Sequence, residues 1–172
     1  MGKNTIILES FSMVNLEDYF KEFNTEIAKY QWPDPFESVD DARSLLQDFI
    51  DEMNNGEMLF YSIKSEDGRF IGSVEVHGLS EECPELGVWV IESEQHKGYA
   101  YEALSMALDK AFTDFGKDKF YYEADIRNIG STKLLQKFEN SYEIIKKGLD
   151  ETVTDSGKEL KLQGYVMRRK HS

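Results

Sequence analysis

The segment of residues 100–115 constrains the fold of this chain more than any other. Its apolar side chains recur three and four positions apart, the spacing of one face of an α-helix. They are Ala100, Ala103, Leu104, Ala107, Leu108, Ala111, Phe112 and Phe115. Gly116 follows directly, and glycine often ends helices because it adopts the left-handed backbone conformation. A helix with one apolar stripe must cover another layer, so we expect a layered α/β fold.

Strand and helix patterns alternate along the rest of the chain, with no linker and no repeat between them. Apolar and β-branched runs predict strands at 5–8, 58–63, 70–76, 86–91, 119–125, 142–149 and 160–167. Helical spacing predicts further helices at 15–27, capped by Asn15, at 38–53, capped by Ser38, and at 128–138. This order predicts one mixed sheet with helices on both faces. A length of 172 residues suits a single domain, 1–172.

The charge balance restricts the classes of partner. The chain carries 33 acidic and 20 basic residues, a formal net charge of −13. Nucleic acid needs a basic footprint, so we do not expect it as a partner. A negative field attracts cations such as amines, although the same charge also serves solubility alone.

Other features favour a soluble cytoplasmic protein. No apolar run approaches the roughly 18 residues of a membrane span, and no signal-peptide core follows Met1. A single cysteine, Cys83, allows no internal disulfide. A domain of this size can bury enough surface to fold without a disulfide or a metal, and we expect neither.

The polar loop between the predicted strand 86–91 and the long helix has the properties of an anion site. The first N–H groups of a helix have no internal acceptor, and they add to the positive end of the helix dipole. Gly98 permits close backbone approach, and Lys97 adds a positive charge. Neither the GxxxxGK[ST] nor the GxGxxG spacing is present. The simpler interpretation, that Gly98 only begins a helix and Lys97 is solvated, stays open on these residues alone.

The run Gln95-x-x-Gly98-x-Ala100 resembles the acetyl-CoA pyrophosphate motif of the GNAT superfamily of N-acetyltransferases. Residues 97–104 are similar to the RimJ/RimL branch, which acetylates protein N-termini and small amines. Asn128-Ile129-Gly130-Ser131, followed by Leu134-Leu135-x-Lys137, resembles that branch's Asn-x-x-Ser helix start. The resemblance implies a GNAT-like, mostly antiparallel twisted sheet with one splayed parallel strand pair, and acetyl-CoA as cosubstrate.

The same resemblance implies roles for individual residues. Pantetheine would lie between the strands 87–91 and 120–125, with backbone N–H groups at Val88 and Val90 forming an oxyanion hole. The pyrophosphate would be held by the loop of Gln95, His96, Lys97, Gly98, Tyr99 and Ala100. Asn128 would bind the pantetheine arm, and Ser131 would be the general acid. The alternative for Asn128 and Ser131 is a purely structural role in capping the helix.

The proton acceptor is less defined by the sequence. Glu85 opens the strand that would carry the acetyl site and is the first candidate for general base. Glu75 and His77 lie two residues apart and therefore share one strand face. An α-amine of pKa near 8 would need no strong base. Trp32 matches the branch's acceptor wall by position only, and a packing role between helices is the favoured interpretation.

Two positions depart from the branch pattern. Gln95-His96 stands where Trp-Gly is common, and the turn after residue 138 lacks the usual Gly-Phe pair. Asn140 can replace glycine at a left-handed cap there. The resemblance implies an enzyme that transfers acetyl to a primary amine of a small molecule or peptide N-terminus, and it allows a homodimer. A catalytically silent acyl-CoA-binding module is the alternative.

Overall fold

The computed structural model describes residues 5–171, which form a seven-stranded sheet in the order β1-β2-β3-β4-β5-β7-β6. The strands are β1 (Ile6–Ser10), β2 (Met58–Ser65), β3 (Phe70–His77), β4 (Glu85–Val90), β5 (Lys119–Asp125), β6 (Tyr142–Val153) and β7 (Glu159–Arg169). The α-helices are α1 (Leu16–Glu22), α2 (Val39–Asn54), α3 (Tyr99–Phe115) and α4 (Ile129–Gln136). Short 3-10 turns are η1 (Met13–Asn15), η2 (Ile27–Tyr30) and η3 (Glu92–Glu94).

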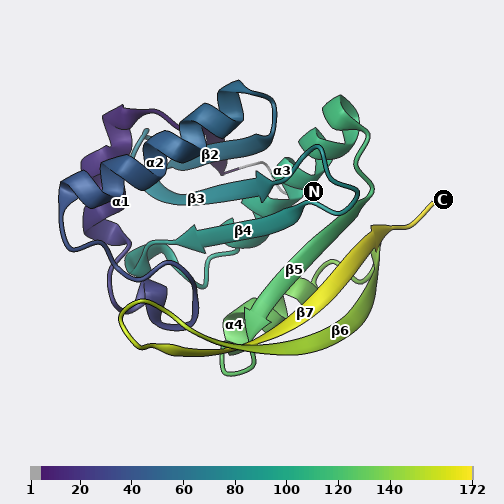
Figure 1. The fold of residues 1–172 in the computed structure, drawn as a ribbon. Helices are drawn as coiled ribbons and strands as arrows, with labels where there is room; N and C mark the ends of the chain where they lie inside the picture. The colour runs from purple at the N-terminus through teal and green to yellow at the C-terminus, as the bar shows by residue number, and fades with distance from the viewer. Residues whose placement is uncertain (1–4, 172) are drawn as a thin grey trace.

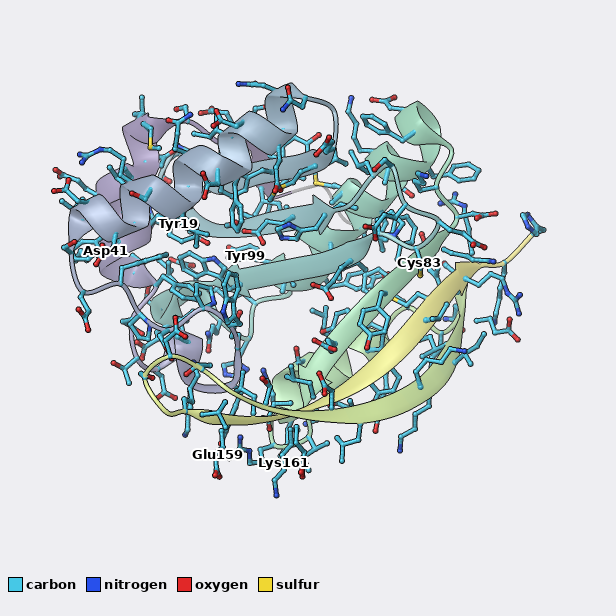
Figure 2. All side chains as sticks on the ribbon, in the orientation of Figure 1. Tyr19, Asp41, Cys83, Tyr99, Glu159 and Lys161 are labelled. Atoms are coloured by element: carbon cyan, nitrogen blue, oxygen red, sulfur yellow. The ribbon has the colours of Figure 1, made fainter. Side chains whose placement is uncertain are left out.

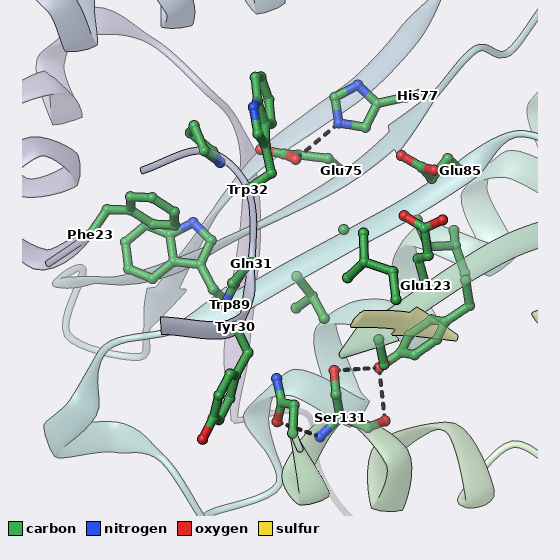
Figure 3. Close-up of a pocket in the computed structure, with 18 of the residues that line it drawn as sticks. Phe23, Tyr30, Gln31, Trp32, Glu75, His77, Glu85, Trp89, Glu123 and Ser131 are labelled. Atoms are coloured by element: carbon green, nitrogen blue, oxygen red, sulfur yellow. Dashed lines mark hydrogen bonds and ion pairs between the residues drawn. The ribbon is translucent and has the colours of Figure 1, made fainter. Parts of the chain in front are cut away.

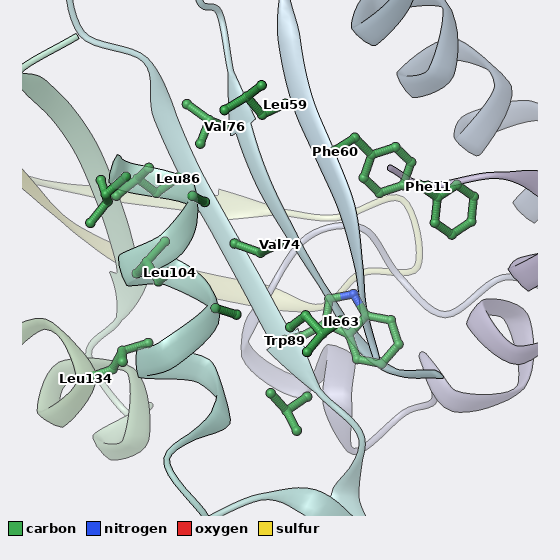
Figure 4. Close-up of a cluster of buried hydrophobic side chains, with 14 of the residues drawn as sticks. Phe11, Leu59, Phe60, Ile63, Val74, Val76, Leu86, Trp89, Leu104 and Leu134 are labelled. Atoms are coloured by element: carbon green, nitrogen blue, oxygen red, sulfur yellow. The ribbon is translucent and has the colours of Figure 1, made fainter. Parts of the chain in front are cut away.

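Helices cover both faces of the sheet, as the sequence predicted. Helices α1 and α2 lie on one face, and α3 and α4 lie on the other (Figure 1). Leu104 and Leu134 fill the core on the α3–α4 side of the strands, and Phe11 and Phe60 fill it on the opposite side (Figure 4). Tyr19 of α1 is also buried, whereas Glu159 and Lys161 are exposed on the outermost hairpin (Figure 2). Among residues 5–171, no helix is both long and apolar enough to cross a bilayer.

The predicted gap in the sheet is present between β4 and β5. Every other neighbouring pair of strands is antiparallel and is paired along several residues. The parallel pair β4–β5 has a single registered pair, Glu85 with Tyr121, next to a hydrogen bond from Tyr121 N–H to the Pro84 carbonyl (2.8 Å). Beyond this point the strands diverge, which leaves backbone groups of β4 without a partner strand.

Helix α3 confirms the helix predicted at residues 100–115, but only part of its apolar stripe is buried. Ala103, Ala107 and Ala111 are fully buried, and their small side chains bring the helix close to the sheet. Phe112, however, is 39% exposed, and its ring lies under the Arg169 guanidinium at 4.0 Å. Phe115, at the last turn, is exposed as well. The apolar stripe therefore extends past the region that the sheet covers.

The helix predicted at residues 15–27 is wrong in extent. Helix α1 ends at Glu22, and the Asn24 side chain accepts a hydrogen bond from Ile27 N–H (3.0 Å), which starts the separate turn η2. Ser38 caps α2 as predicted, by accepting from Asp41 N–H (3.1 Å). Asn15 makes no such cap, because its carboxamide accepts from the buried Ser62 hydroxyl instead (3.3 Å).

Two further predictions near the C-terminus need correction. The last strands are longer than predicted, because β6 and β7 pair with each other as far as Val153 and Glu159. Asn140 is not left-handed, since within the described residues His96 is the non-glycine residue with positive φ. The chain turns after α4 by hydrogen bonds from Ser141 and Tyr142 N–H to the Phe138 carbonyl instead (3.0 and 2.8 Å).

Candidate active site

A cavity of about 400 Å³ opens where β4 and β5 diverge. Its wall combines residues of β3, β4 and β5 with the start of α4, side chains of α1 and α2, and the segment 30–33 (Figure 3). Glu75, His77, Glu85, Val88, Asn128 and Ser131, all singled out from the sequence, line it together. The fold thus brings the Asn128–Ser131 motif and the candidate bases to one space, whereas the loop of residues 95–100 and Val90 are not part of its lining.

Backbone N–H groups of β4 point into the gap. Ile91 N–H donates to the Ile71 carbonyl on the β3 side (2.9 Å). Successive N–H groups of a strand point in opposite directions, so those of Val88 and Val90 point toward β5. The β5 strand pairs with β4 only at Glu85, so it supplies no acceptor for them. Both predicted oxyanion-hole positions therefore present donors at the cavity side of the strand.

The loop before α3 adopts an unusual backbone. His96 has φ 65° and Gly98 has φ 85°, both in the left-handed region. Gln95 anchors the loop, because its Nε2 donates to the Val90 carbonyl (3.1 Å). The first helical hydrogen bond runs from Glu102 N–H to the Gly98 carbonyl (3.1 Å), so the N–H groups of Tyr99 and Ala100 lie ahead of the helical ladder. Gly98 has nothing within 4 Å of the position that a Cβ would take.

Lys97 is tethered rather than freely mobile. Its Nζ lies 2.8 Å from Glu94 Oε2, and Glu94 also pairs with Arg69 (3.4 Å). The hydrogen bond to Glu94 raises the pKa of Lys97, and the hydrogen bond from Lys97 lowers that of Glu94. Glu94 is buried but Lys97 is about half exposed, and solvent screening keeps the contribution of such a pair to stability small. Lys97 and Arg69 therefore supply two cations beside the loop, partly balanced by one carboxylate.

Asn128 and Ser131 hold the start of α4 in the manner of a helix cap. Asn128 Oδ1 accepts from Ser131 N–H at 3.1 Å, so the capping oxygen belongs to Asn128. The Ser131 hydroxyl takes no part in the cap and lies 3.0 Å from the Tyr122 hydroxyl. Tyr122 also donates to the Ser131 carbonyl (2.9 Å). Burial raises the pKa of Tyr122 to about 12, so its hydroxyl stays protonated.

The opposite wall carries the candidate bases. His77 Nε2 lies 3.0 Å from Glu75 Oε2, which confirms that these residues share a face. Burial lowers the pKa of His77, but the hydrogen bond and charge of Glu75, with Glu85 and Glu52, outweigh it and the pKa is raised. Glu85 lies at the exposed start of β4, where desolvation and the charge of Glu123 raise its pKa.

Trp32 does not pack between helices, so the favoured sequence interpretation is wrong. The indole is 63% exposed and lines the cavity. The position of Trp32 depends on a contact with a residue far along the chain. Lys158 Nζ donates to the carbonyls of Ala28 (2.6 Å) and Gln31 (2.7 Å), which fixes the segment before Trp32 against the β6–β7 hairpin.

Several cavity residues carried no signal in the sequence. Tyr122, Glu123 and Glu52 look like ordinary residues of a strand or an exposed helix face. Only strand pairing and helix packing bring them to the cavity. Alternation along β5 could have shown that Glu123 and Tyr122 face opposite sides, but not which side faces the site.

This geometry has counterparts in known proteins. Residues 5–139 match the family model of the acetyltransferase (GNAT) domain. No curated protein gives a significant sequence match. Among solved structures, a spermidine N-acetyltransferase from Vibrio cholerae, in complex with CoA and spermine, is similar with a TM-score of 0.79. It is 18% identical, and the match covers 96% of both chains.

Two further structures share the fold. Mycobacterium smegmatis RimJ, in complex with CoA-disulfide, has a TM-score of 0.80 and 18% identity over 95% of this chain and 81% of its own. An acetyltransferase from Salmonella typhimurium that modifies the N-terminal serine of ribosomal protein L7/L12 has a TM-score of 0.79. It is 14% identical over 98% of this chain and 97% of its own. The family match over most of the chain, with this fold, shows that the protein belongs to the GNAT family of acetyltransferases.

Proposed function

We propose that this GNAT protein transfers the acetyl group of acetyl-CoA to a primary amine that enters the acidic cavity. One observation carries the proposal: the gap between β4 and β5 presents the N–H groups of Val88 and Val90 next to the loop that begins α3. Hydrogen-bond donors for the thioester and for the pyrophosphate therefore lie at two places in one continuous stretch of chain. We include β6 and β7 in this unit and treat 1–172 as one domain, because both strands complete the sheet.

The two faces of the sheet carry different groups of the site. Strand alternation puts Tyr122 on the α4 side, where it meets Ser131, and puts Glu123 on the other face with Glu75 and Glu85. The cosubstrate therefore enters from the α3–α4 side, with Asn128 and the loop of Gln95, His96, Lys97, Gly98, Tyr99 and Ala100 along its path. The amine enters from the carboxylate side. The reacting groups meet at the gap.

Each residue has a defined task in this arrangement. Val88 and Val90 N–H stabilise the negative charge that develops on the thioester oxygen. Ser131 donates a proton to the departing sulfur, and the Tyr122 hydroxyl, 3.0 Å from the Ser131 hydroxyl, holds the serine side chain in position. A silent acyl-CoA-binding module would need the loop but would have no use for the Ser131–Tyr122 pair.

Cofactor binding and turnover can be tested separately. Calorimetry with acetyl-CoA measures binding, and release of free CoA over a panel of amines and N-terminal peptides measures turnover. We expect both. Binding without turnover of any amine would support the silent module, and no binding at millimolar acetyl-CoA would refute the proposal.

Gly98→Ala tests the position of the pyrophosphate. A Cβ at this left-handed residue blocks the backbone approach and adds about 1 kcal/mol of strain, so affinity should fall. Gly116→Ala is the matched control, because Gly116 is also left-handed (φ 67°) but ends the same helix at its far side. Equal affinities in the two variants would mean that the phosphates lie elsewhere.

A further inference from the structure

The register of β3 and β4 fixes where one carboxylate lies. Glu75 is directly opposite Gly87, and a Cβ at Gly87 would come within 3.0 Å of Glu75 Oε2. The missing side chain of Gly87 therefore leaves the space that the Glu75 carboxylate occupies. Val88, whose N–H points into the gap, is the next residue along β4. Glu75 is thus level with the proposed acetyl site.

Glu85 lies at a different level on the same strand. It precedes Gly87 by two residues and Val88 by three, which at about 3.4 Å per residue is about 7 and 10 Å. A glutamate side chain does not span the longer distance. Across the gap, Glu123 lies two residues beyond Tyr121, the register partner of Glu85, and its side chain points into the same space (Figure 3). Glu85 and Glu123 therefore flank a second level of the cavity.

In the described part of the chain, these two carboxylates have no lysine or arginine partner, and the nearest titratable base is His77, the register partner of Glu85. Within residues 5–171, neither Glu85 nor Glu123 forms an ion pair, and Glu123 accepts only from the Tyr121 hydroxyl (3.0 Å). The described lining of the cavity contains Glu52, Glu75, Glu85 and Glu123 but no lysine or arginine. Carboxylates that share a partly desolvated space repel each other unless a cation joins them.

We propose that the acceptor is an aliphatic diamine whose reacting nitrogen lies at the Glu75 carboxylate and whose distal ammonium lies between Glu85 and Glu123. This inference rests on the acetyl transfer proposed above. The levels of Glu75 and Glu85 differ by about 7 Å, which five or six single bonds of about 1.5 Å can bridge, since each advances about 1.25 Å along a zigzag chain. Four or five methylene groups between the nitrogens fit this spacing. Glu85, the base expected from the sequence, then acts in specificity, and Glu75 lies where a base is needed.

The chemical step balances with these groups. The entering ammonium gives one proton to the Glu75–His77 pair, which passes it to solvent. The nitrogen lone pair forms the C–N bond, and the C–S bond breaks with its electrons on sulfur. The nitrogen then loses a second proton to solvent, and Ser131 gives its proton to sulfur and regains one from solvent. The sum is R–NH3⁺ plus acetyl-CoA yielding the amide, CoA–SH and H⁺.

Three acceptors that share a four-carbon chain separate charge from shape. 1,4-Diaminobutane carries the distal ammonium, 4-aminobutan-1-ol replaces it by a neutral hydroxyl, and butylamine replaces it by hydrogen. We expect kcat/KM for the diamine to exceed that for either monoamine by about 10- to 100-fold, the worth of a charge-assisted hydrogen bond. Similar kcat/KM values for all three would overturn the diamine inference while acetyl transfer stands. No CoA release with any amine would refute acetyl transfer itself.

Substitutions test which carboxylate binds which nitrogen of the diamine. Glu85→Gln and Glu123→Gln should each remove most of the preference for the diamine and leave kcat/KM for butylamine within about twofold. Glu75→Gln should lower kcat for both acceptors. Glu66→Gln, in the exposed turn between β2 and β3, is the matched control. A preference that survives both Glu85→Gln and Glu123→Gln, in proteins with unchanged melting temperature, would overturn the assignment.

Discussion

Replacing Ser131 by alanine separates a catalytic hydroxyl from a structural one. The structure makes this substitution clean, because the capping hydrogen bond of α4 uses the Ser131 backbone N–H and the Asn128 side chain. Alanine keeps that bond. It removes only the contact of the hydroxyl with Tyr122, and Tyr122 keeps its bond to the Ser131 carbonyl (2.9 Å).

The expected costs follow from those contacts. Loss of one side-chain hydrogen bond whose partner keeps another is worth about 0.5–1.5 kcal/mol of unfolding free energy. A general acid contributes about 10²- to 10⁴-fold to the rate of the chemical step. We therefore expect Ser131→Ala to lower kcat by about 10²-fold or more, with only a small fall in melting temperature. The Kd for acetyl-CoA should barely change, because the interaction is made mainly in the transition state.

The assay needs three measurements on the same protein: kcat from CoA release under saturating substrates, Kd from calorimetry, and the melting temperature. Tyr122→Phe is the companion variant, since it removes the hydroxyl that positions Ser131 and leaves the serine hydroxyl in place. We expect it to lower kcat less than Ser131→Ala does. If Ser131→Ala lowers the melting temperature but leaves kcat intact, the hydroxyl is structural and the reasoning fails.

The remaining predictions concern pH and the cavity mouth. The proton acceptor must be unprotonated, so kcat/KM should fall as pH drops through the raised pKa of His77. Glu75→Gln should move that fall to lower pH, because it removes the carboxylate that raises this pKa. An unmoved pH profile would exclude Glu75 and His77 as the proton acceptor. The hydrogen bond from Arg127 to Asp125 leads the contacts that lower the pKa of this buried carboxyl to about 2. Because the folded-state pKa lies below the ordinary value, Asp125 should contribute about 2 kcal/mol of stability that is complete above pH ~4 and is lost as pH falls toward 2. Melting curves of wild type and Asp125→Asn over this range should converge at low pH, and a constant difference would contradict the assignment. Trp32→Ala should raise KM for the amine and leave the Kd of acetyl-CoA unchanged, since the indole lines the amine side of the cavity; a changed cofactor Kd would place it elsewhere.

Local features of the site were predictable because their residues are close in sequence. The loop of residues 95–100 joins a strand to a helix that its own apolar spacing defines, and a glycine at a helix start permits the left-handed backbone conformation found there. Asn128 and Ser131 are three residues apart, so their cap follows from helical geometry alone. The family resemblance rested on these two stretches, and the family match confirms it.

What only the tertiary structure decided depends on contacts between distant segments. Glu75 and Gly87 meet through the register of β3 and β4, and a shift of one residue would turn Glu75 away from the cavity. Lys158 directs Trp32 from more than a hundred residues further along the chain. Neither register nor packing leaves a mark in the spacing of one segment, since each depends on the free energy of the whole sheet. The local sequence could therefore identify the cosubstrate loop, while the amine side of the site was set by how β3, β4 and β5 lie against one another.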